Sequence, residues 1–199
     1  MEGIFYYWMM WIAWIITTFF MEKQKVRIKL TIFLLVNICI SELYWVIGHF
    51  YVRISLLLFL GLGYYLSVKK NNNKLLSYYL IILTLTFAYA SILLFYIYDP
   101  VWFLFDYRLT VSITVSVLAI YLGKHIVQKY AMYILAVCQG ELIYWFILGK
   151  FHSGLIIGTA AFLDMVVIGC VIIYLWTTVQ QFIVSLERIF EKPAKEKQG

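Results

Sequence analysis

Long apolar runs separated by short charged segments form the hydrophobic pattern of this chain. A helix needs about 20 mostly apolar residues to cross ~30 Å of hydrocarbon. Runs of roughly this length recur from the first residues to residue 179. They predict seven membrane-spanning helices, at about residues 3–21, 30–48, 50–68, 75–98, 101–122, 130–148 and 154–179.

Lysine and arginine are distributed unevenly between the segments that connect these runs. Cytoplasmic loops accumulate both residue types, whereas translocated loops do not. Seven crossings place thirteen basic residues on one side: Lys23, Lys25, Arg27, Lys29, Lys69, Lys70, Lys74, Lys124, Lys129, Arg188, Lys192, Lys195 and Lys197. The other side receives three, Arg53, Arg108 and Lys150. If residues 101–122 did not cross, the split would be eight to eight, so the charges favour seven spans with the N-terminus outside and the C-terminus in the cytoplasm.

Apolar residues continue at helical spacing beyond the last run, at Phe182, Ile183, Leu186, Ile189 and Phe190. This amphipathic pattern predicts an interfacial helix along the cytoplasmic surface, reaching residue 191. A docking helix for a partner is the alternative. Residues 192–199 are predicted to form a disordered cytoplasmic tail, which leaves residues 1–191 as a single transmembrane helical domain.

Composition agrees with this architecture. The chain is 64% hydrophobic and 13% charged, against roughly 45–50% and 25% in soluble domains. These values exclude a soluble fold. The net charge of +6 does not indicate a nucleic-acid binder, because the basic residues sit in short clusters between apolar runs and form no single basic face. The sequence therefore predicts an all-α integral membrane helix bundle.

Two of the predicted helices carry related residue patterns. The order Cys, Glu, Leu, Tyr, Trp, Ile, Gly, Phe begins at Cys39 in the second helix and again at Cys138 in the sixth. Chance similarity is one interpretation, because the offset grows from 99 to 101 along the motif. The other is a three-plus-one-three parallel repeat, in which the two units share one orientation and Glu42 faces Glu141 at one depth.

Three acidic residues fall inside predicted spans and are the candidate functional groups. They are Glu42, Glu141 and Asp164. A charged side chain at the centre of a membrane helix costs at least ~2.5–3.5 kcal/mol, so an intramembrane acid is a functional candidate by default. The two glutamates are expected ~9–10 Å below the outer surface, and Asp164 is expected near the midplane.

No lysine or arginine is expected at a comparable depth. The possible charge partners lie near the outer boundary, at His49, Arg53, Arg108 and His152. Three interpretations of the acids stay open. In the first, the carboxyl groups are protonated and act as interhelical hydrogen-bond donors. In the second, the acids form a proton or cation site. In the third, the carboxylates reach outward to Arg53 or Arg108.

Sequence motifs for catalysis or metal binding are weak. Cys39 and Cys138 each precede a glutamate by three residues, which makes a mixed thiol and carboxylate metal site conceivable. The sequence has no paired cysteine or histidine spacing to strengthen it. It also lacks the His-Glu-x-x-His and Gly-x-Ser-x-Gly patterns of hydrolases. We therefore expect no enzyme activity, no metal and no cofactor.

The N-terminal segment MEGIFYYW, followed by Trp11, the Trp14-Ile-Ile segment and a Thr18-Phe-Phe-Met segment before a lysine-rich loop, resembles the YphA family of uncharacterised membrane proteins from Bacillus-type bacteria. Chain length and hydropathy agree along the whole sequence. The resemblance implies a location in the bacterial cytoplasmic membrane. It brings no known activity, cofactor or catalytic residue.

The function expected from these features is that of a multi-pass, non-catalytic structural, sensory or assembly component of the membrane. The alternative is a proton- or cation-coupled carrier or channel for small solutes that uses the intramembrane carboxylates, and an intramembrane enzyme is a third possibility. Expected partners are membrane lipid and either another membrane protein or a second copy of the chain. No nucleic-acid partner is expected.

Overall fold

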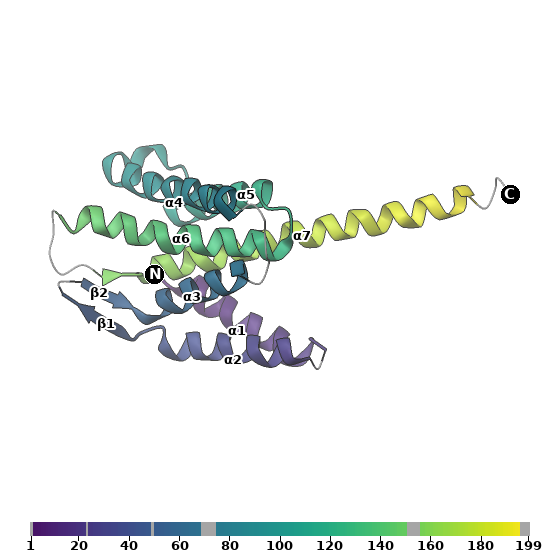
Figure 1. Ribbon diagram of the computed structural model, residues 1–199, viewed down its shortest axis with the longest axis horizontal. Helices are drawn as coiled ribbons and strands as arrows, with labels where there is room; N and C mark the ends of the chain where they lie inside the picture. Colours follow the sequence, from purple (N-terminus) through teal and green to yellow (C-terminus); the bar gives the residue numbers. More distant parts are fainter. Residues whose placement is uncertain (1, 23, 49, 69–74, 151–155, 196–199) are drawn as a thin grey trace.

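The computed structural model of the chain describes residues 2–22, 24–48, 50–68, 75–150 and 156–195 (Figure 1). Each predicted span corresponds to an α-helix, with shifted ends. The helices are α1 (Ile4–Phe19), α2 (Lys25–Ile40), α3 (Ile54–Val68), α4 (Leu75–Tyr98), α5 (Tyr107–Leu122), α6 (Ile126–Leu148) and α7 (Ala160–Lys195), with a short 3-10 helix η1 (Pro100–Trp102) between α4 and α5.

Three segments within these helices are long and apolar enough to cross a membrane, Leu76–Tyr98, Ile126–Leu148 and Ala160–Glu187. The helices α1, α3 and α5 are apolar but shorter, with 16, 15 and 16 residues. Helix α2 begins in the lysine-rich segment that follows α1, so its apolar part is shorter than the predicted run.

Helix α6 forms the centre of the bundle. It packs against α3 and α4, and α5 lies along α7, while α1 contacts both α2 and α7. Figure 1 shows α6 between a layer that contains α4 and α5 and a layer that contains α1, α2 and α3. Residues 131–138 of α6 are all buried. A helix that is enclosed on every side belongs to the core of a bundle.

A small β-sheet occupies parts of three predicted spans and corrects the all-α prediction. Strands β1 (Tyr44–Ile47) and β2 (Phe50–Arg53) pair antiparallel, and β3 (Ile156–Ile157) pairs parallel with β2. Ile47 pairs with Phe50 across a two-residue loop in which Gly48 has a φ of 61°. Aromatic and β-branched residues favour strands, and glycine adopts this backbone conformation without strain. The apolar run at residues 30–48 therefore contains a shorter helix and a strand.

Helix α7 is the longest element, with 36 residues. Figure 1 shows that its C-terminal part continues away from the bundle in the direction of its first half. The interfacial helix predicted to residue 191 is thus the end of a continuous helix that reaches Lys195. The last residues of the predicted tail, 196–199, lie outside the described residues.

Candidate functional site

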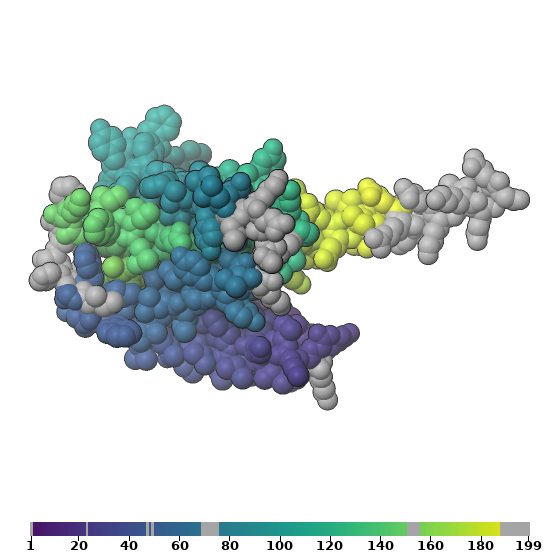
Figure 2. Space-filling model, in the orientation of Figure 1, coloured from purple at the N-terminus to yellow at the C-terminus, as the bar shows by residue number. Residues whose placement is uncertain are grey.

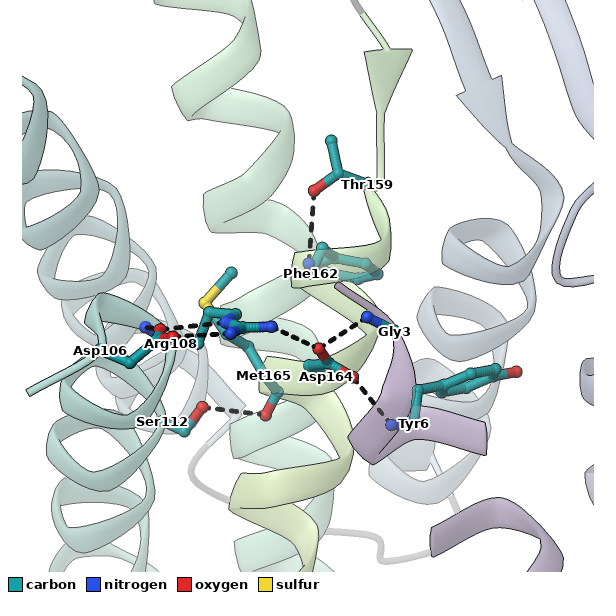
Figure 3. Close-up of polar contacts among 9 residues, drawn as sticks. All are labelled: Gly3, Tyr6, Asp106, Arg108, Ser112, Thr159, Phe162, Asp164 and Met165. Atoms are coloured by element: carbon teal, nitrogen blue, oxygen red, sulfur yellow. Dashed lines mark hydrogen bonds and ion pairs between the residues drawn. The ribbon is translucent and has the colours of Figure 1, made fainter. Parts of the chain in front are cut away.

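Asp164 lies near the start of α7 and is completely buried. Its Oδ2 atom accepts a hydrogen bond from the backbone nitrogen of Gly3 at 2.8 Å, and its Oδ1 atom accepts one from the backbone nitrogen of Tyr6 at 2.8 Å. The guanidinium of Arg108 donates from Nη1 to Oδ2, also at 2.8 Å (Figure 3). One carboxylate therefore joins α7 to the start of α1 and to α5.

The contacts with Gly3 and Tyr6 make Asp164 the cap of another helix. The first backbone N–H groups of an α-helix have no partner within that helix. Gly3 is the N-cap residue of α1, has a φ of 89° and makes no side-chain cap bond. Asp164 supplies the missing acceptor from α7, and its negative charge lies at the positive end of the α1 dipole.

Arg108 is held between two carboxylates. Its Nε and Nη2 atoms donate to Oδ1 and Oδ2 of Asp106 at 3.0 and 2.6 Å, while Nη1 reaches Asp164. Asp106 is also the N-cap of α5 and accepts the backbone N–H of Arg108 at 2.9 Å. These hydrogen bonds hold the pKa of the Asp106 carboxyl below its usual value. Asp106 therefore holds the guanidinium in the position from which it contacts Asp164.

The polypeptide around Asp164 is fixed by further hydrogen bonds (Figure 3). The Thr159 hydroxyl accepts from the backbone nitrogen of Phe162 at 3.4 Å and caps the start of α7. The Ser112 hydroxyl of α5 donates to the carbonyl of Met165 at 3.2 Å, and the Tyr133 hydroxyl of α6 donates to the same carbonyl at 2.6 Å. The first turns of α7 are thus tied to α5 and α6 as well as to α1.

Glu141 forms a second and separate site in α6, where it is 2% exposed. Its Oε2 atom accepts from the hydroxyl of Tyr89 on α4 at 2.7 Å, and its Oε1 atom accepts from the indole N–H of Trp145 at 2.8 Å. The backbone N–H groups of Gly158 and Thr159, just before α7, approach the same carboxyl. Its hydrogen-bond partners among the described residues are therefore neutral.

Glu42 lies in a third setting, beyond the end of α2 and before β1. Its side chain is 68% exposed. Oε1 accepts from the Tyr7 hydroxyl at 2.7 Å, and Oε2 lies 4.0 Å from Nη2 of Arg53. The Tyr7 hydroxyl also lies 2.8 Å from the Ser41 hydroxyl. This group links α1 to the segment between α2 and the sheet.

The three acids predicted as candidates thus have different partners, and the structure does not gather them at one site. Arg108 contacts Asp164, and Arg53 lies beside Glu42, as one interpretation of the sequence anticipated. Asp164 is the fifth residue of α7, because this helix begins at Ala160 and not near residue 154. The remaining charge partners predicted from the sequence, His49 and His152, lie outside the described residues.

The Cys and Glu motifs of the predicted repeat occupy unlike environments. Cys39 and Glu42 are exposed, whereas Cys138 and Glu141 are buried. Helix α2 ends at Ile40, so Glu42 does not share a helical face with Cys39. The structure gives no support to a duplicated unit. Within the described part of the chain, no three His, Cys, Asp or Glu side chains lie together as metal ligands.

Several partners of the acids were not identified from the sequence. Trp145 follows Glu141 by four residues, a spacing that places both side chains on one helical face. This spacing is the feature of the sequence that could have indicated the contact. Gly3 at the start of an apolar helix, without a capping side chain, indicated an unsatisfied N-terminus. Tyr89 carried no local signal, because it lies 52 residues from Glu141.

The apolar helices and the buried ion pair are features of a helical integral membrane protein. The chain belongs to the YphA-like integral membrane protein family, whose model matches residues 2–199, so the resemblance found in the sequence is confirmed. It is similar to the uncharacterised protein YphA of Bacillus subtilis (strain 168), with 32% identity over 178 residues, which cover 87% of this chain and 86% of that protein. No solved structure matches the chain.

Proposed function

We propose that this protein is a non-catalytic structural or assembly component of the bacterial cytoplasmic membrane. The arrangement around Asp164 is the observation that carries this proposal. Its carboxylate accepts three hydrogen bonds from protein donors on α1 and α5, and a carboxylate has about four acceptor positions. Little capacity is left for a transported cation, and the group fastens three helices together.

Seven crossings with an outside N-terminus are part of this proposal. Helices of 16 residues, such as α1 and α5, are about 24 Å long, and local thinning of the bilayer accommodates short spans. The division of thirteen basic residues against three supports the same topology. Cysteines introduced singly at Asn72 and at Gln198 should both be labelled from the cytoplasmic side, and labelling from opposite sides would contradict the topology.

Flux measurements on the purified protein in lipid vesicles test the structural role. We expect proton and alkali-cation flux equal to that of protein-free vesicles, together with a lower thermal stability of the Asp164→Asn variant. Glu42→Gln is the matched control, because that carboxyl is exposed and its loss should change stability little. Protein-dependent flux that disappears in Asp164→Asn, with thermal stability unchanged, would overturn the proposal.

A second candidate function, a proton-coupled carrier, is favoured by Glu141. An intramembrane carboxyl without a cationic partner is a candidate proton-binding group, and the hydrogen-bond partners of Glu141 in the described chain are neutral. Wild-type vesicles would then dissipate an imposed pH gradient, and Glu141→Gln would abolish this activity while the protein stays folded. Equal dissipation by both proteins would reject this candidate.

A further inference from the structure

Lys129 is a buried cation whose charge no described residue balances. Four charged side chains are buried within the described chain, namely Arg53, Lys129, Glu141 and Asp164. Arg53, Glu141 and Asp164 each have a hydrogen-bond partner. Lys129 is 7% exposed, and none of the described residues forms an ion pair or a side-chain hydrogen bond with its ammonium group. Lysine is almost never buried to this degree unless it is paired, so the site lacks an anion.

The side chain of Lys129 is directed towards the connection between α5 and α6. Side chains in a helix lean towards its N-terminal end, and Lys129 is the fourth residue of α6. A Cβ atom at Gly123 would lie 2.6 Å from Cγ of Lys129, so the lysine stem covers this glycine. The connection lies at the end of the bundle from which the C-terminal part of α7 projects (Figure 1 and Figure 2). The lysine charge is therefore added to the start of α6.

The start of α6 is itself positive. The backbone N–H groups of Ile126, Val127 and Gln128 have no carbonyl partner within the helix, because Lys129 makes the first helical bond, to the carbonyl of His125 at 3.0 Å. The N-cap residue, His125, makes no side-chain cap bond, and the first turn of α6 has no acidic residue. A cation at this end of the helix dipole is unfavourable. Two positive features thus lie together, and one anion would compensate both.

A phosphate group attached to acyl chains is the anion that fits these surroundings. Free N–H groups at the start of a long helix bind phosphate oxygens, and lysine binds phosphate as a point charge. The exposed side chains nearby in the chain are both basic and apolar, because Lys124 is exposed together with Tyr121, Ile126 and Val127. Basic pockets between membrane helices bind the headgroups of anionic lipids. The apolar neighbours favour a lipid over a free phosphate ion.

We propose that the start of α6, together with Lys129 and Lys124, binds the phosphate group of an anionic phospholipid. The backbone N–H groups of Ile126 and Val127 donate to the phosphate oxygens, and the Lys129 ammonium pairs with their charge. This inference goes beyond the proposed function, because it assigns a ligand to a site outside the three acid clusters. The proposed topology places the site in the cytoplasmic leaflet, where anionic lipid is abundant. Binding in detergent tests the site without reference to that topology.

Thermal unfolding of the purified full-length protein in mild detergent tests the site. Phosphatidylglycerol should raise the unfolding midpoint by about 2–4 °C relative to phosphatidylcholine with the same acyl chains. Lys129→Met should lose this rise, and Lys129→Arg should keep it. Lys25→Met is the matched control, because Lys25 is an exposed lysine at the start of α2, and it should respond as the wild type does. An equal loss in Lys129→Met and Lys25→Met, or a rise that Lys129→Met retains, would overturn the proposal.

Native mass spectrometry of the wild-type protein gives an independent readout that needs no variant. From an equal mixture of the two lipids, the protein should retain phosphatidylglycerol about fivefold more often than phosphatidylcholine. Equal retention would overturn the proposal. Inorganic phosphate without lipid should leave the unfolding midpoint unchanged. A rise with inorganic phosphate that equals the lipid effect and depends on Lys129 would overturn the assignment to a lipid and identify free phosphate as the ligand.

Discussion

The backbone nitrogen of Gly3 lies 2.8 Å from Oδ2 of Asp164, although the two residues are 161 positions apart in the chain. This bond and the parallel one from Tyr6 make the start of α1 depend on a residue near the other end of the sequence. Because α1 has no side-chain cap of its own, a residue of the last helix stabilises the N-terminal end of the first one.

Replacement of Asp164 by asparagine should strongly destabilise the fold. The change removes the charge that compensates Arg108 and the α1 dipole, and breaking a buried ion pair costs about 3–5 kcal/mol of unfolding free energy. The measurement is thermal or denaturant unfolding in detergent. Asp99→Asn is the control, because Asp99 caps the short η1 helix, and its effect should be under about 1 kcal/mol. Equal losses in the two variants would contradict the capping role.

Arg108 and Asp164 should be energetically coupled. Arg108→Ala leaves the buried Asp164 carboxylate without its cation. Asp164→Asn leaves the Arg108 guanidinium with Asp106 as its remaining acidic partner. The double variant should therefore be more stable than the sum of the two single losses predicts, by about 0.5–3 kcal/mol. Unfolding of the four proteins in one detergent measures this coupling. Strict additivity would show that the 2.8 Å contact contributes no specific stability.

Stability should fall in acid because of Asp106. Its pKa is lowered in the folded protein by hydrogen bonds to Arg108, so the folded state holds this proton less tightly than the unfolded chain. The contribution of Asp106 is complete above the unfolded pKa of about 3.9 and is lost as pH falls through the lower folded value. Asp106→Asn should therefore reduce the loss of thermal stability below about pH 4. An unchanged pH profile would reject this origin.

Gly169 should be irreplaceable where α7 crosses α6. A Cβ atom there would collide with the ring of Tyr133, whereas a Cβ at Gly61 meets nothing nearby. Gly169→Ala should cost about 1–3 kcal/mol through overpacking and should displace the Tyr133 hydroxyl from the Met165 carbonyl. Gly61→Ala, in α3, should be neutral or stabilising by up to about 1 kcal/mol. Similar unfolding curves for both variants would contradict the close approach.

Much of the helical framework follows from local sequence. The runs at residues 3–21 and 75–98 contain α1 and α4, because continuous apolar character is a property of neighbouring residues. The same reasoning is wrong at residues 44–53, where apolar residues form a hairpin. An apolar run alone does not distinguish a strand from a helix, and the turn at Gly48 depends on backbone geometry.

The sequence by itself determined that this is a helical membrane protein and that three acids lie among or beside its apolar segments, since hydropathy and charge need no knowledge of packing. Tertiary structure alone decided what each acid binds. Arg108 and Asp164 are 56 residues apart in the chain, and Tyr89 and Glu141 are 52 residues apart. Such pairs are fixed by how whole helices pack, because a buried carboxylate takes whichever donors the neighbouring helices bring within reach.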